Sequence, residues 1–562
     1  MTVRKEGICM RTVMVDIKPN HPAAPYFGKN TAESRAVRNT ANFLIRNAMT
    51  GLRKPPEERT HTETEALHTV FTGIQKANAH KEAMDEKAVF SAFRKIKSGE
   101  LTGLKAHAFL KSKLEACGKR FRYPTAQNWF LNYETLDAIL KHTGNAAYYS
   151  CTSQVNQQAI RKTAASWKSY FQALKDWNRN PGKYQAKPRI PGYIREREAT
   201  AHFTNQVCRL VHAGGRLYLG FANCDQFVCL GNESLIPGKL VKVEAKPRYG
   251  RYRLCITYED ALQEPAVPAA PKRILGLDVG VTNFLAGVSN TGAAPFLIKG
   301  GWLKSLNQWY NKRRAKLMSA VTKGSDSKHS RKTSRALSAL SRKRDDKIRD
   351  FFYKTAHWIM RWCVERRIEV IVIGCSKEMK QEISIGSINN QNFVTIPYER
   401  FRSILKVVGC RYGIPVIEQE ESYTSKASLL DLDEVPVYGK EDADTAVFSG
   451  NRAKRGMYVS REGKLINADI NGAGNILRKA YPYAFNGVKM EYLCSSVSAI
   501  AGEQVLHKKH KAPVKHYHRH RSAAGKVRHF YRQEKRMQLR MVWENRDDTY
   551  KKKNRPPAKA AA

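Results

Sequence analysis

The amino-acid sequence predicts a multidomain protein of the α+β class. Its 562 residues are too many for one ordinary hydrophobic core, and 42% of them are apolar, which is enough to pack several cores. The residue pattern also changes along the chain, from helical spacing to short alternating runs typical of antiparallel strands, and then to a mixture of strands and helices. We therefore expect separate helical, all-β and mixed modules.

The helical module is expected in residues 31–180, after one or more strands within residues 1–30. Its clearest helix is SQVNQQAIRKTAASWKSYFQALKDW, residues 153–177, where apolar side chains recur at helical spacing and cations lie between them. This pattern predicts an amphipathic helix with a basic outer side. The cations that we expect to contact nucleic acid there are Arg161, Lys162 and Lys168.

An antiparallel β module is expected in residues 181–270. Glycine, prolines and cations in NRNPGKYQAKPRIP interrupt the helical pattern, and residues 199–258 consist of short alternating runs separated by turns. Such runs are typical of a small antiparallel barrel or sheet. The predicted linker to the remaining chain is ALQEPAVPAAP, residues 261–271.

Residues 271–485 have the element order of an RNase H-type sheet. Three short strands joined by tight turns begin at residue 273, and a long basic helical stretch follows to about residue 367. The remaining predicted elements are a strand at 368–374, a helix near 396–411, a strand at 414–420 and a helix in DINGAGNILRKA. A three-stranded meander followed by alternating helices and strands is the order of that fold.

The charge of the chain predicts a polyanionic partner. Lysine and arginine outnumber aspartate and glutamate by 98 to 50, and the formal charge of +48 is spread along the whole sequence. Nucleic acid is the expected partner, because self-repulsion on this scale otherwise costs stability. Further candidate contacts are Arg313, Arg314, Arg342, Lys343, Arg344, Arg452 and Arg455. The aromatic residues near them, Trp302, Trp309 and Tyr310, either stack on bases or pack in a helical core, and core packing is favoured.

The C-terminal extension, residues 486–562, is basic as well. From residue 507 it carries six of the 16 histidines, which lack a fixed ligand spacing, so an arm that coats nucleic acid is favoured over a metal site. The eleven cysteines contain no C-x-x-C pair, which argues against zinc and against a disulfide framework. No apolar run of about 18 residues or signal peptide is evident, and we expect a soluble cytoplasmic protein without a membrane partner.

Two aspartates are candidates for a catalytic site. Asp278 lies inside a predicted strand, ILGLDVGVTN, where a lone buried carboxylate is costly unless a cation, a hydrogen-bonding cluster or a metal compensates. Gly276 and Gly280 bracket it and permit close approach of a ligand or another backbone. Asp469 opens the last predicted helix, where it is either the helix cap or a member of the same site.

A third acid is needed if the site hydrolyses phosphodiester bonds with two divalent ions, because such sites use carboxylates from separate elements. An RNase H-type sheet supplies one from the end of its fourth strand, but this chain has Gly374 and Cys375 there. Glu378 follows in a predicted loop and is a poor substitute. Strand five lies beside strand four in that topology, so Glu420 or Glu421 can fill the vacant place.

The choice between these two glutamates depends on where strand five ends. Strand alternation places Glu418 and Glu420 on one face and Glu421 on the other, unless the strand ends at Glu420. Glu421 is favoured because it enters the following turn. The alternative is that these glutamates are solvated residues at a strand end.

These motifs closely resemble the TnpB family of transposon-encoded RNA-guided nucleases and the related compact type V CRISPR effectors. GLDVGVTN resembles the first RuvC motif of the family, ESYTSK the segment before its zinc-ribbon region, and NADINGAGNI its third RuvC motif. The stretches SQVNQQAIRKTAASWKSYF, KPRIPGY and YRLCITYED resemble the recognition helix, the approach to the wedge barrel and the last strand of that barrel. The resemblance covers roughly residues 120–480.

Two positions depart from the family pattern. The second RuvC glutamate usually ends the IVIG strand, where this chain has Gly374. The usual zinc-ribbon cysteines are absent from the predicted insertion at 424–465, which has Ala427 and Ser428 instead. The first departure resembles a subgroup with a rearranged catalytic glutamate, here Glu420 or Glu421, and loss of cleavage is the alternative.

The resemblance implies a helical recognition lobe, a wedge β-barrel and a RuvC nuclease domain that together form an RNA-guided DNA endonuclease. Asp278, Asp469 and Glu421 or Glu420 would hold two magnesium ions, which manganese can replace, and no zinc is expected. The implied partners are a guide RNA and double-stranded target DNA with a short flanking motif, bound by a monomer or by a homodimer on one guide. The alternatives are a guided DNA-binding protein without cleavage and an unguided transposase or resolvase.

Overall fold

Two compact units make up the chain in the computed structural model, one built mainly from Met10–Asp260 and the other from Ala261–Arg519. Helices and strands occur in both, which confirms a multidomain α+β protein. The residues that the structure describes are 9–150, 152–261, 263–324, 333–375, 396–437, 446–454, 456–494 and 497–506. Glu378, Arg455 and the basic tail from residue 507 lie outside them.

The first unit contains the expected helical region. Its helices are α1 (Ala24–Gly51), α2 (His61–Lys97), α3 (Gly103–Ala116), α4 (Tyr133–His142), α5 (Ala146–Tyr149) and α6 (Ser153–Arg179). The amphipathic helix predicted from sequence is α6, and its buried Trp167 donates a hydrogen bond from Nε1 to Asn42 Oδ1 of α1 at 2.8 Å. The opposite side of α6 exposes the predicted cations, so the helix is buried on one side and basic on the other.

The antiparallel strands expected in the first unit form two sheets over one core. One sheet has the order β1-β7-β6-β2, formed by Cys9–Ile17, Arg251–Asp260, Leu240–Arg248 and Ala201–Thr204. The other has the order β3-β4-β5, formed by Cys208–Ala213, Arg216–Phe221 and Cys224–Asn232. Aromatic rings join the two sheets, and the centroids of Phe203 and Phe221 lie 4.9 Å apart.

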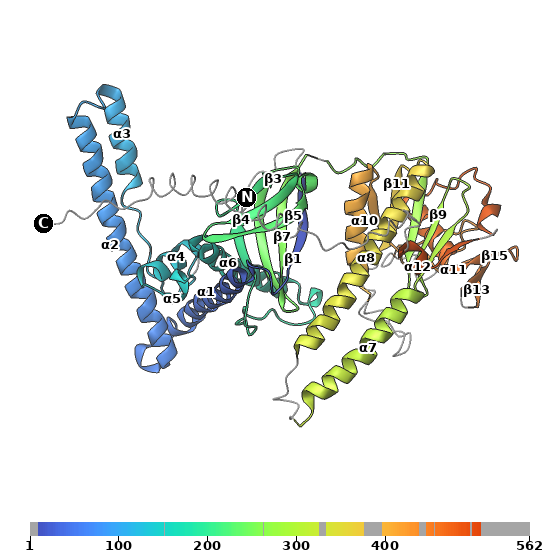
Figure 1. Ribbon diagram of the computed structural model, residues 1–562, viewed down its shortest axis with the longest axis horizontal. Helices are drawn as coiled ribbons and strands as arrows, with labels where there is room; N and C mark the ends of the chain where they lie inside the picture. Colours follow the sequence, from blue (N-terminus) through green and yellow to red (C-terminus); the bar gives the residue numbers. More distant parts are fainter. Residues whose placement is uncertain are drawn as a thin grey trace, which may run out of the picture. The chain divides into compact units, whose positions relative to one another are not determined.

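The second unit is organised around a six-stranded sheet (Figure 1). Its order is β12-β11-β8-β9-β10-β16, formed by Val416–Glu420, Val370–Cys375, Ile274–Val279, Asn283–Ser289, Phe296–Lys299 and Ser498–Ile500. β8, β9 and β10 are antiparallel, whereas β11 runs parallel to β8, and β12 parallel to β11. This order and these directions are those predicted for an RNase H-type sheet, with strand five beside strand four. The edge strand β16, parallel to β10, was not predicted.

Helices cover both faces of this sheet. On one face, α8 (Arg335–Glu365) and α10 (Tyr398–Tyr412) pack with residues such as Leu275 and Leu277. On the other face, α11 (Ala468–Ala480) packs with Ile274 and its neighbours. The remaining elements are α7 (Gly301–Thr322), α12 (Gly502–Leu506) and a small sheet of β13 (Asn451–Lys454), β14 (Met457–Val459) and β15 (Leu465–Asn467).

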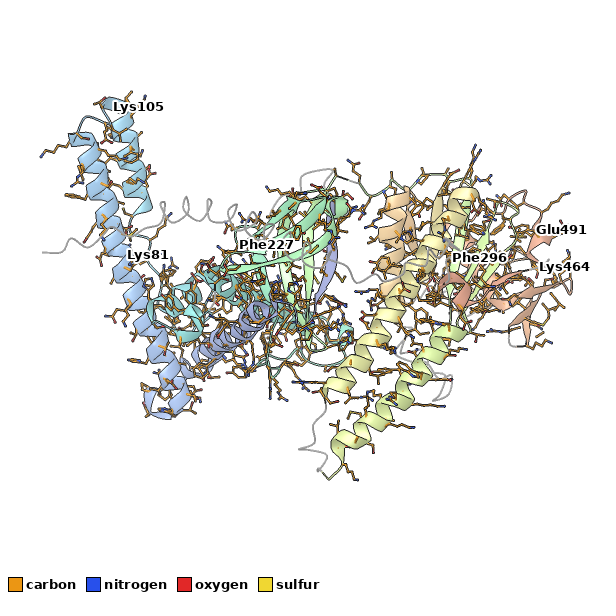
Figure 2. All side chains as sticks on the ribbon, in the orientation of Figure 1. Lys81, Lys105, Phe227, Phe296, Lys464 and Glu491 are labelled. Atoms are coloured by element: carbon orange, nitrogen blue, oxygen red, sulfur yellow. The ribbon has the colours of Figure 1, made fainter. Side chains whose placement is uncertain are left out.

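The core is filled by interdigitated aromatic rings where the sheet meets α8. Phe296 of β10 is almost fully buried, and its ring centroid lies 5.0 Å from that of Trp358 and 5.1 Å from that of Trp362 (Figure 2). Trp302, at the start of α7, stacks on Phe351 with centroids 5.3 Å apart. The prediction of core packing is therefore confirmed for Trp302.

Gly276 allows α11 to approach the central strand β8 closely. A Cβ atom at this position would overlap the carbonyl oxygen of Ala473 and would lie 2.7 Å from Leu477 Cβ. The backbone approach that the glycine predicted therefore occurs, and α11 is the element that makes it. Any side chain at residue 276 would push α11 away from the sheet.

We predict that Gly276→Ala displaces α11 and lowers the free energy of unfolding by at least about 2 kcal/mol, because the obstructing atom belongs to backbone and cannot rotate away. Hydrogen–deuterium exchange of residues 468–480, together with urea unfolding, measures both effects. Gly301→Ala is the matched control, since a Cβ at Gly301 meets nothing within 4 Å. Unchanged exchange in the Gly276→Ala protein would contradict the close packing.

Candidate functional site

The carboxyl ends of β8, β11 and β12 lie at the same edge of the six-stranded sheet, because these strands are parallel neighbours. Asp278 is the second-last residue of β8 and is half-buried on the face that α11 covers. A Cβ atom at Gly472 of α11 would lie 2.9 Å from Asp278 Oδ2. The carboxylate therefore occupies a narrow space that a larger residue at 472 would fill.

The pKa of Asp278 is raised well above its usual value. Exclusion of water is the main cause, and the negative charges of Glu421 and Asp469 raise it further. The backbone of Val279 and the charge of Arg452, in β13, act in the opposite direction. Glu421 and Asp469 are thus close enough to Asp278 to act on it electrostatically.

Asp469 lies in the first turn of α11 but does not cap it. The cap is Asn467, whose Oδ1 accepts hydrogen bonds from the backbone N–H groups of Asp469 at 3.0 Å and Ile470 at 3.4 Å. The interpretation of Asp469 as the helix cap is therefore wrong: the residue two positions earlier satisfies the free N–H groups.

The Asp469 side chain instead binds the strand beside β8. Asn283 Nδ2, at the start of β9, donates a hydrogen bond to Asp469 Oδ2 at 2.5 Å. Lys299 Nζ donates to Asn283 Oδ1 at 3.0 Å and so fixes the orientation of the amide. Asn283 and Lys299 were not identified from the sequence. Asn283 lies in the GLDVGVTN motif. The tight turn predicted after β8 could have indicated that Asn283 lies close to Asp278, because the chain reverses direction there.

Glu421 occupies the space beside Gly374. β12 ends at Glu420, and a Cβ atom built at Gly374 would lie 2.6 Å from Glu421 Oε2. That oxygen is buried and has no hydrogen-bond partner among the described residues. Burial raises the pKa of Glu421 to about 7, while nearby Arg402 lowers it and Glu420 raises it. The acid missing from the end of β11 is thus matched by a carboxylate from the segment after β12.

Glu420 has a different environment from Glu421. Its Oε2 accepts a hydrogen bond from Lys479 Nζ of α11 at 2.5 Å, and its Oε1 accepts one from the backbone N–H of Ser422 at 2.6 Å. Lys479 also donates to the carbonyl oxygen of Ser422 at 2.9 Å, and its side chain is only 4% exposed. Glu420 therefore fastens the end of β12 to α11.

The expected strand alternation does not extend to Glu420. Glu418 pairs with Lys406 of α10 at 2.9 Å, whereas Glu420 pairs with Lys479 of α11, the helix on the other face of the sheet. The strand ends at Glu420, which is the exception that the alternation argument allowed. The chain turns there, and Tyr423, with φ of 64°, adopts the left-handed conformation.

The segment after Glu421 is held by polar side chains of α11. Asn471 Nδ2 donates to the Ala427 carbonyl at 2.8 Å, and Asn475 Nδ2 donates to the same carbonyl at 2.7 Å. Ala427 and Ser428, which stand where the family has zinc-ribbon cysteines, are buried in this packing. One helix therefore carries Asp469 and also anchors the segment that carries Glu421.

The candidate nucleic-acid contacts fall into separate regions. Arg161, Lys162 and Lys168 are exposed on α6, and Arg161 lies 4.2 Å from the ring centroid of Tyr133. Exposed cations elsewhere are Arg313 and Arg314 of α7, Lys343 of α8 and Arg452 of β13, and Arg342 is half-buried.

Arg344 is engaged within the protein. Its Nε donates to Asn307 Oδ1 at 2.8 Å, and its guanidinium lies 5.0 Å from the ring centroid of Tyr310. These contacts join α8 to α7.

A metal ion is compatible with the donor set at the acidic cluster. Asp278, Glu421 and Asp469 supply the oxygen ligands that hard divalent cations prefer, and Glu421 Oε2 lacks a partner in the described part of the chain. Within those same residues, no group of three or more His, Cys, Asp and Glu side chains is already arranged to hold an ion.

A family model matches part of the second unit and the strand before it. Residues 254–380 match the model OrfB_IS605, described as a probable transposase. The resemblance to TnpB-like proteins is thereby confirmed for this segment. The segment contains Asp278 and Gly374 but ends before Glu421 and Asp469.

Two solved structures are similar to this chain at low sequence identity. The protein in a cryo-EM structure of a Cas12f1-sgRNA-target DNA complex is 11% identical, with 84% of this chain and 99% of that chain covered and a TM-score of 0.41. C2c1 of Alicyclobacillus acidoterrestris, in complex with single-guide RNA, is 9% identical, with 86% and 89% covered and a TM-score of 0.35. No curated protein matches the chain, and none of the described helices has the length and apolarity needed to cross a bilayer.

We predict that Lys479→Met loosens the end of β12, because it removes hydrogen bonds to Glu420 and Ser422, and that it costs about 1–3 kcal/mol of unfolding free energy. Urea unfolding and hydrogen exchange of residues 416–426 measure the change. Glu418→Gln, which removes an exposed pair, should cost less than about 1 kcal/mol. The double variant Glu420→Gln/Lys479→Met should be no less stable than Lys479→Met alone; additive losses would show that the two residues act independently.

Proposed function

We propose that the chain is an RNA-guided DNA endonuclease with a single site at the edge of the six-stranded sheet. The observation that carries this proposal is the placement of the Glu421 carboxylate beside Gly374, where the RuvC pattern usually has its own glutamate. Asp278 from β8 and Asp469 from α11 complete the set of acids. The match of residues 254–380 to a TnpB-like family model supports the same activity.

Asp278, Glu421 and Asp469 would hold magnesium, for which manganese can substitute. When bound, these ions activate water and stabilise charge on the phosphate. The protein's own residues prepare the site: Asn283 and Lys299 orient Asp469, and the Glu420–Lys479 pair fixes the backbone next to Glu421. Arg402 of α10, which is only 6% exposed, offsets negative charge at Glu421.

The proposed partners are a guide RNA and double-stranded target DNA. Base pairing with the guide would select the target, and the protein would hold the heteroduplex by its backbone and read only a short flanking motif. The exposed cations of α6, α7 and α8 have the charge for such backbone contacts. Titration of the protein with labelled guide–target duplex at rising salt tests this, because phosphate contacts make affinity fall steeply with salt.

A guided DNA-binding protein without cleavage is the second candidate. It is favoured by Gly374, which stands where the family pattern usually has its second RuvC glutamate. An unguided transposase is the third, and the description of the matching family model as a probable transposase favours it. Sequencing the RNA that co-purifies with the full chain separates the guided candidates from the unguided one.

We predict that Asp278→Asn, Glu421→Gln and Asp469→Asn each reduce magnesium-dependent cleavage of guided DNA by at least about 1,000-fold, since each removes one charged ligand from a group that acts together. Guided DNA binding should persist, because the proposed duplex contacts lie elsewhere. Gel analysis of cleavage and calorimetric titration of manganese into the protein give independent readouts. Glu418→Gln, on the same strand but paired with Lys406, is the control and should cut normally.

Two results would decide against this assignment. Cleavage at the parent rate by the Glu421→Gln protein would remove Glu421 from the site. A parent protein that binds guided DNA but never cuts it with magnesium or manganese would establish the second candidate.

We also predict that a glutamate at residue 374 of β11 can take over the role of Glu421. Gly374→Glu alone should impair cleavage, because its Cβ would lie 2.6 Å from Glu421 Oε2 and 2.7 Å from Ile476 Cδ1. Glu421→Ala should abolish cleavage, and adding Gly374→Glu to it should restore a measurable part, because the alanine vacates the space. Single-turnover cleavage assays compare the three proteins. Equal inactivity of the single Glu421→Ala and double variants would mean that the two positions do not share one ligand site.

A further inference from the structure

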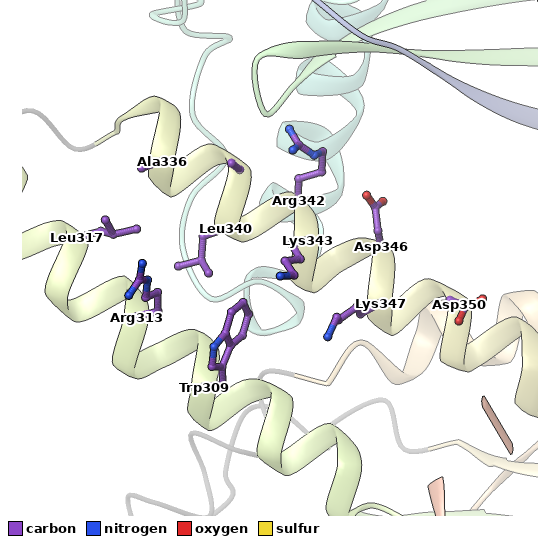
Figure 3. A pocket seen from close by; sticks show the side chains of 11 residues that line it. Trp309, Arg313, Leu317, Ala336, Leu340, Arg342, Lys343, Asp346, Lys347 and Asp350 are labelled. Atoms are coloured by element: carbon purple, nitrogen blue, oxygen red, sulfur yellow. The ribbon is translucent and has the colours of Figure 1, made fainter. Parts of the chain in front are cut away.

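A groove of about 770 Å³ lies between α7 and α8 (Figure 3). Leu317 of α7 and Ala336 and Leu340 of α8 give it an apolar lining. Trp309 of α7 also lines it and is 40% exposed, in contrast to Trp302, which stacks in the core. The favoured core-packing interpretation thus does not apply to Trp309, whose indole faces an open groove.

The rim of this groove is cationic. Arg313 of α7 and Arg342, Lys343 and Lys347 of α8 border it, and Lys343 Nζ lies 5.5 Å from the centroid of a Trp309 ring. No acidic partner for these four cations is found among the described residues.

Two acids also line the groove, but each already has a cationic partner outside it. Asp346 pairs with Arg349 at 3.4 Å, and Asp350 pairs with Lys354 at 2.8 Å. The charge that remains for a ligand is therefore positive.

We propose that this groove binds an unpaired DNA strand, with one base stacked on Trp309 and the neighbouring phosphates on the four rim cations. Within a duplex each base is covered by its stacked neighbours, so stacking on Trp309 away from a duplex end requires an unpaired base. Stacking platforms flanked by cations are the general means by which proteins hold single strands without reading their sequence. The combination of apolar lining, exposed indole and uncompensated cations fits this ligand.

The start of α7 is hydrogen-bonded to Thr282, next to the candidate cleavage site. The N–H of Gly300, just before α7, donates to the Thr282 carbonyl at 2.9 Å, and Lys304 Nζ donates to Thr282 Oγ1 at 3.3 Å. Thr282 precedes Asn283, the residue that holds Asp469. Trp309 is eight residues beyond Gly301, or about 12 Å along the helix axis at 1.5 Å per residue.

A strand held in the groove would therefore extend over a few nucleotides to the carboxylates. This is why DNA, the strand to be cut, is the inferred occupant. The inference rests on the proposed endonuclease function. The groove would hold the strand next to the bond that is cleaved.

Photo-cross-linking tests the proposal in the full chain with its co-purified RNA. The protein carries Asp278→Asn, so that the oligonucleotide is not cut during the measurement. A single-stranded DNA oligonucleotide with 5-iododeoxyuridine should cross-link to the peptide that contains Trp309. Trp309→Ala should weaken binding of the same oligonucleotide about tenfold, as loss of one stacked base does, and Trp309→Phe should retain most of the affinity. Tyr353→Ala is the matched control, because Tyr353 is 38% exposed on α8 but does not line the groove.

Three outcomes would overturn the proposal. The first is equal affinity in the Trp309→Ala and Tyr353→Ala proteins, and the second is cross-linking of Trp309 to the co-purified RNA, substituted with 4-thiouridine, instead of to DNA. The third is a change of oligomeric state in Trp309→Ala without any change in DNA binding, which would identify the groove as a contact between copies. If Trp309 binds DNA as proposed but the parent protein never cuts DNA, the proposed endonuclease function is wrong, whereas the proposed DNA-binding role of the groove is supported.

Discussion

The close packing of α11 on β8 is the contact on which the candidate site depends. Gly276 lets the backbone of α11 approach the central strand, and this places Asp469 opposite the Asp278 end of β8. The same helix extends Asn471 and Asn475 to the segment that follows β12, and Lys479 to Glu420. α11 thus sets the positions of Asp469 and Glu421 relative to Asp278. These acids are separated by up to 191 residues in the sequence, from Asp278 to Asp469. A shift of α11 would move all of these contacts together.

The Glu421 carboxylate occupies the space that a side chain at residue 374 would need. β11 and β12 are adjacent and parallel, with Gly374 opposite Gln419 in the register, so the segment just after β12 can return over the end of β11. The absence of a side chain at residue 374 leaves room for the Glu421 carboxylate, and Ile476 of α11 closes the same space. A glutamate at 374 and a glutamate at 421 would compete for it. This exclusion gives a physical reason for finding the acid at one position and glycine at the other.

Much of the sheet could be predicted from the sequence, because it follows from local patterns. The three-strand meander, IEVIVIG, IPVIEQE and the helix of DINGAGNILRKA all occur where they were expected, and strand five lies beside strand four. The side-chain arrangement could be predicted less well. Asn467 and Asp469 are two positions apart, and residue propensity does not tell which of them caps α11. The separation of Glu420 from Glu421 depends on Lys479, which is 59 residues away in sequence.

The electrostatics of the second unit explain why acids gather at this one place in a basic chain. Exclusion of water and the negative charges of Glu421 and Asp469 raise the pKa of Asp278, so the cluster costs free energy unless positive charge lies nearby. Arg402 and Arg452 supply part of that charge from separate elements, α10 and β13. Glu421 Oε2, which is buried, is left without a hydrogen-bond partner among the described residues.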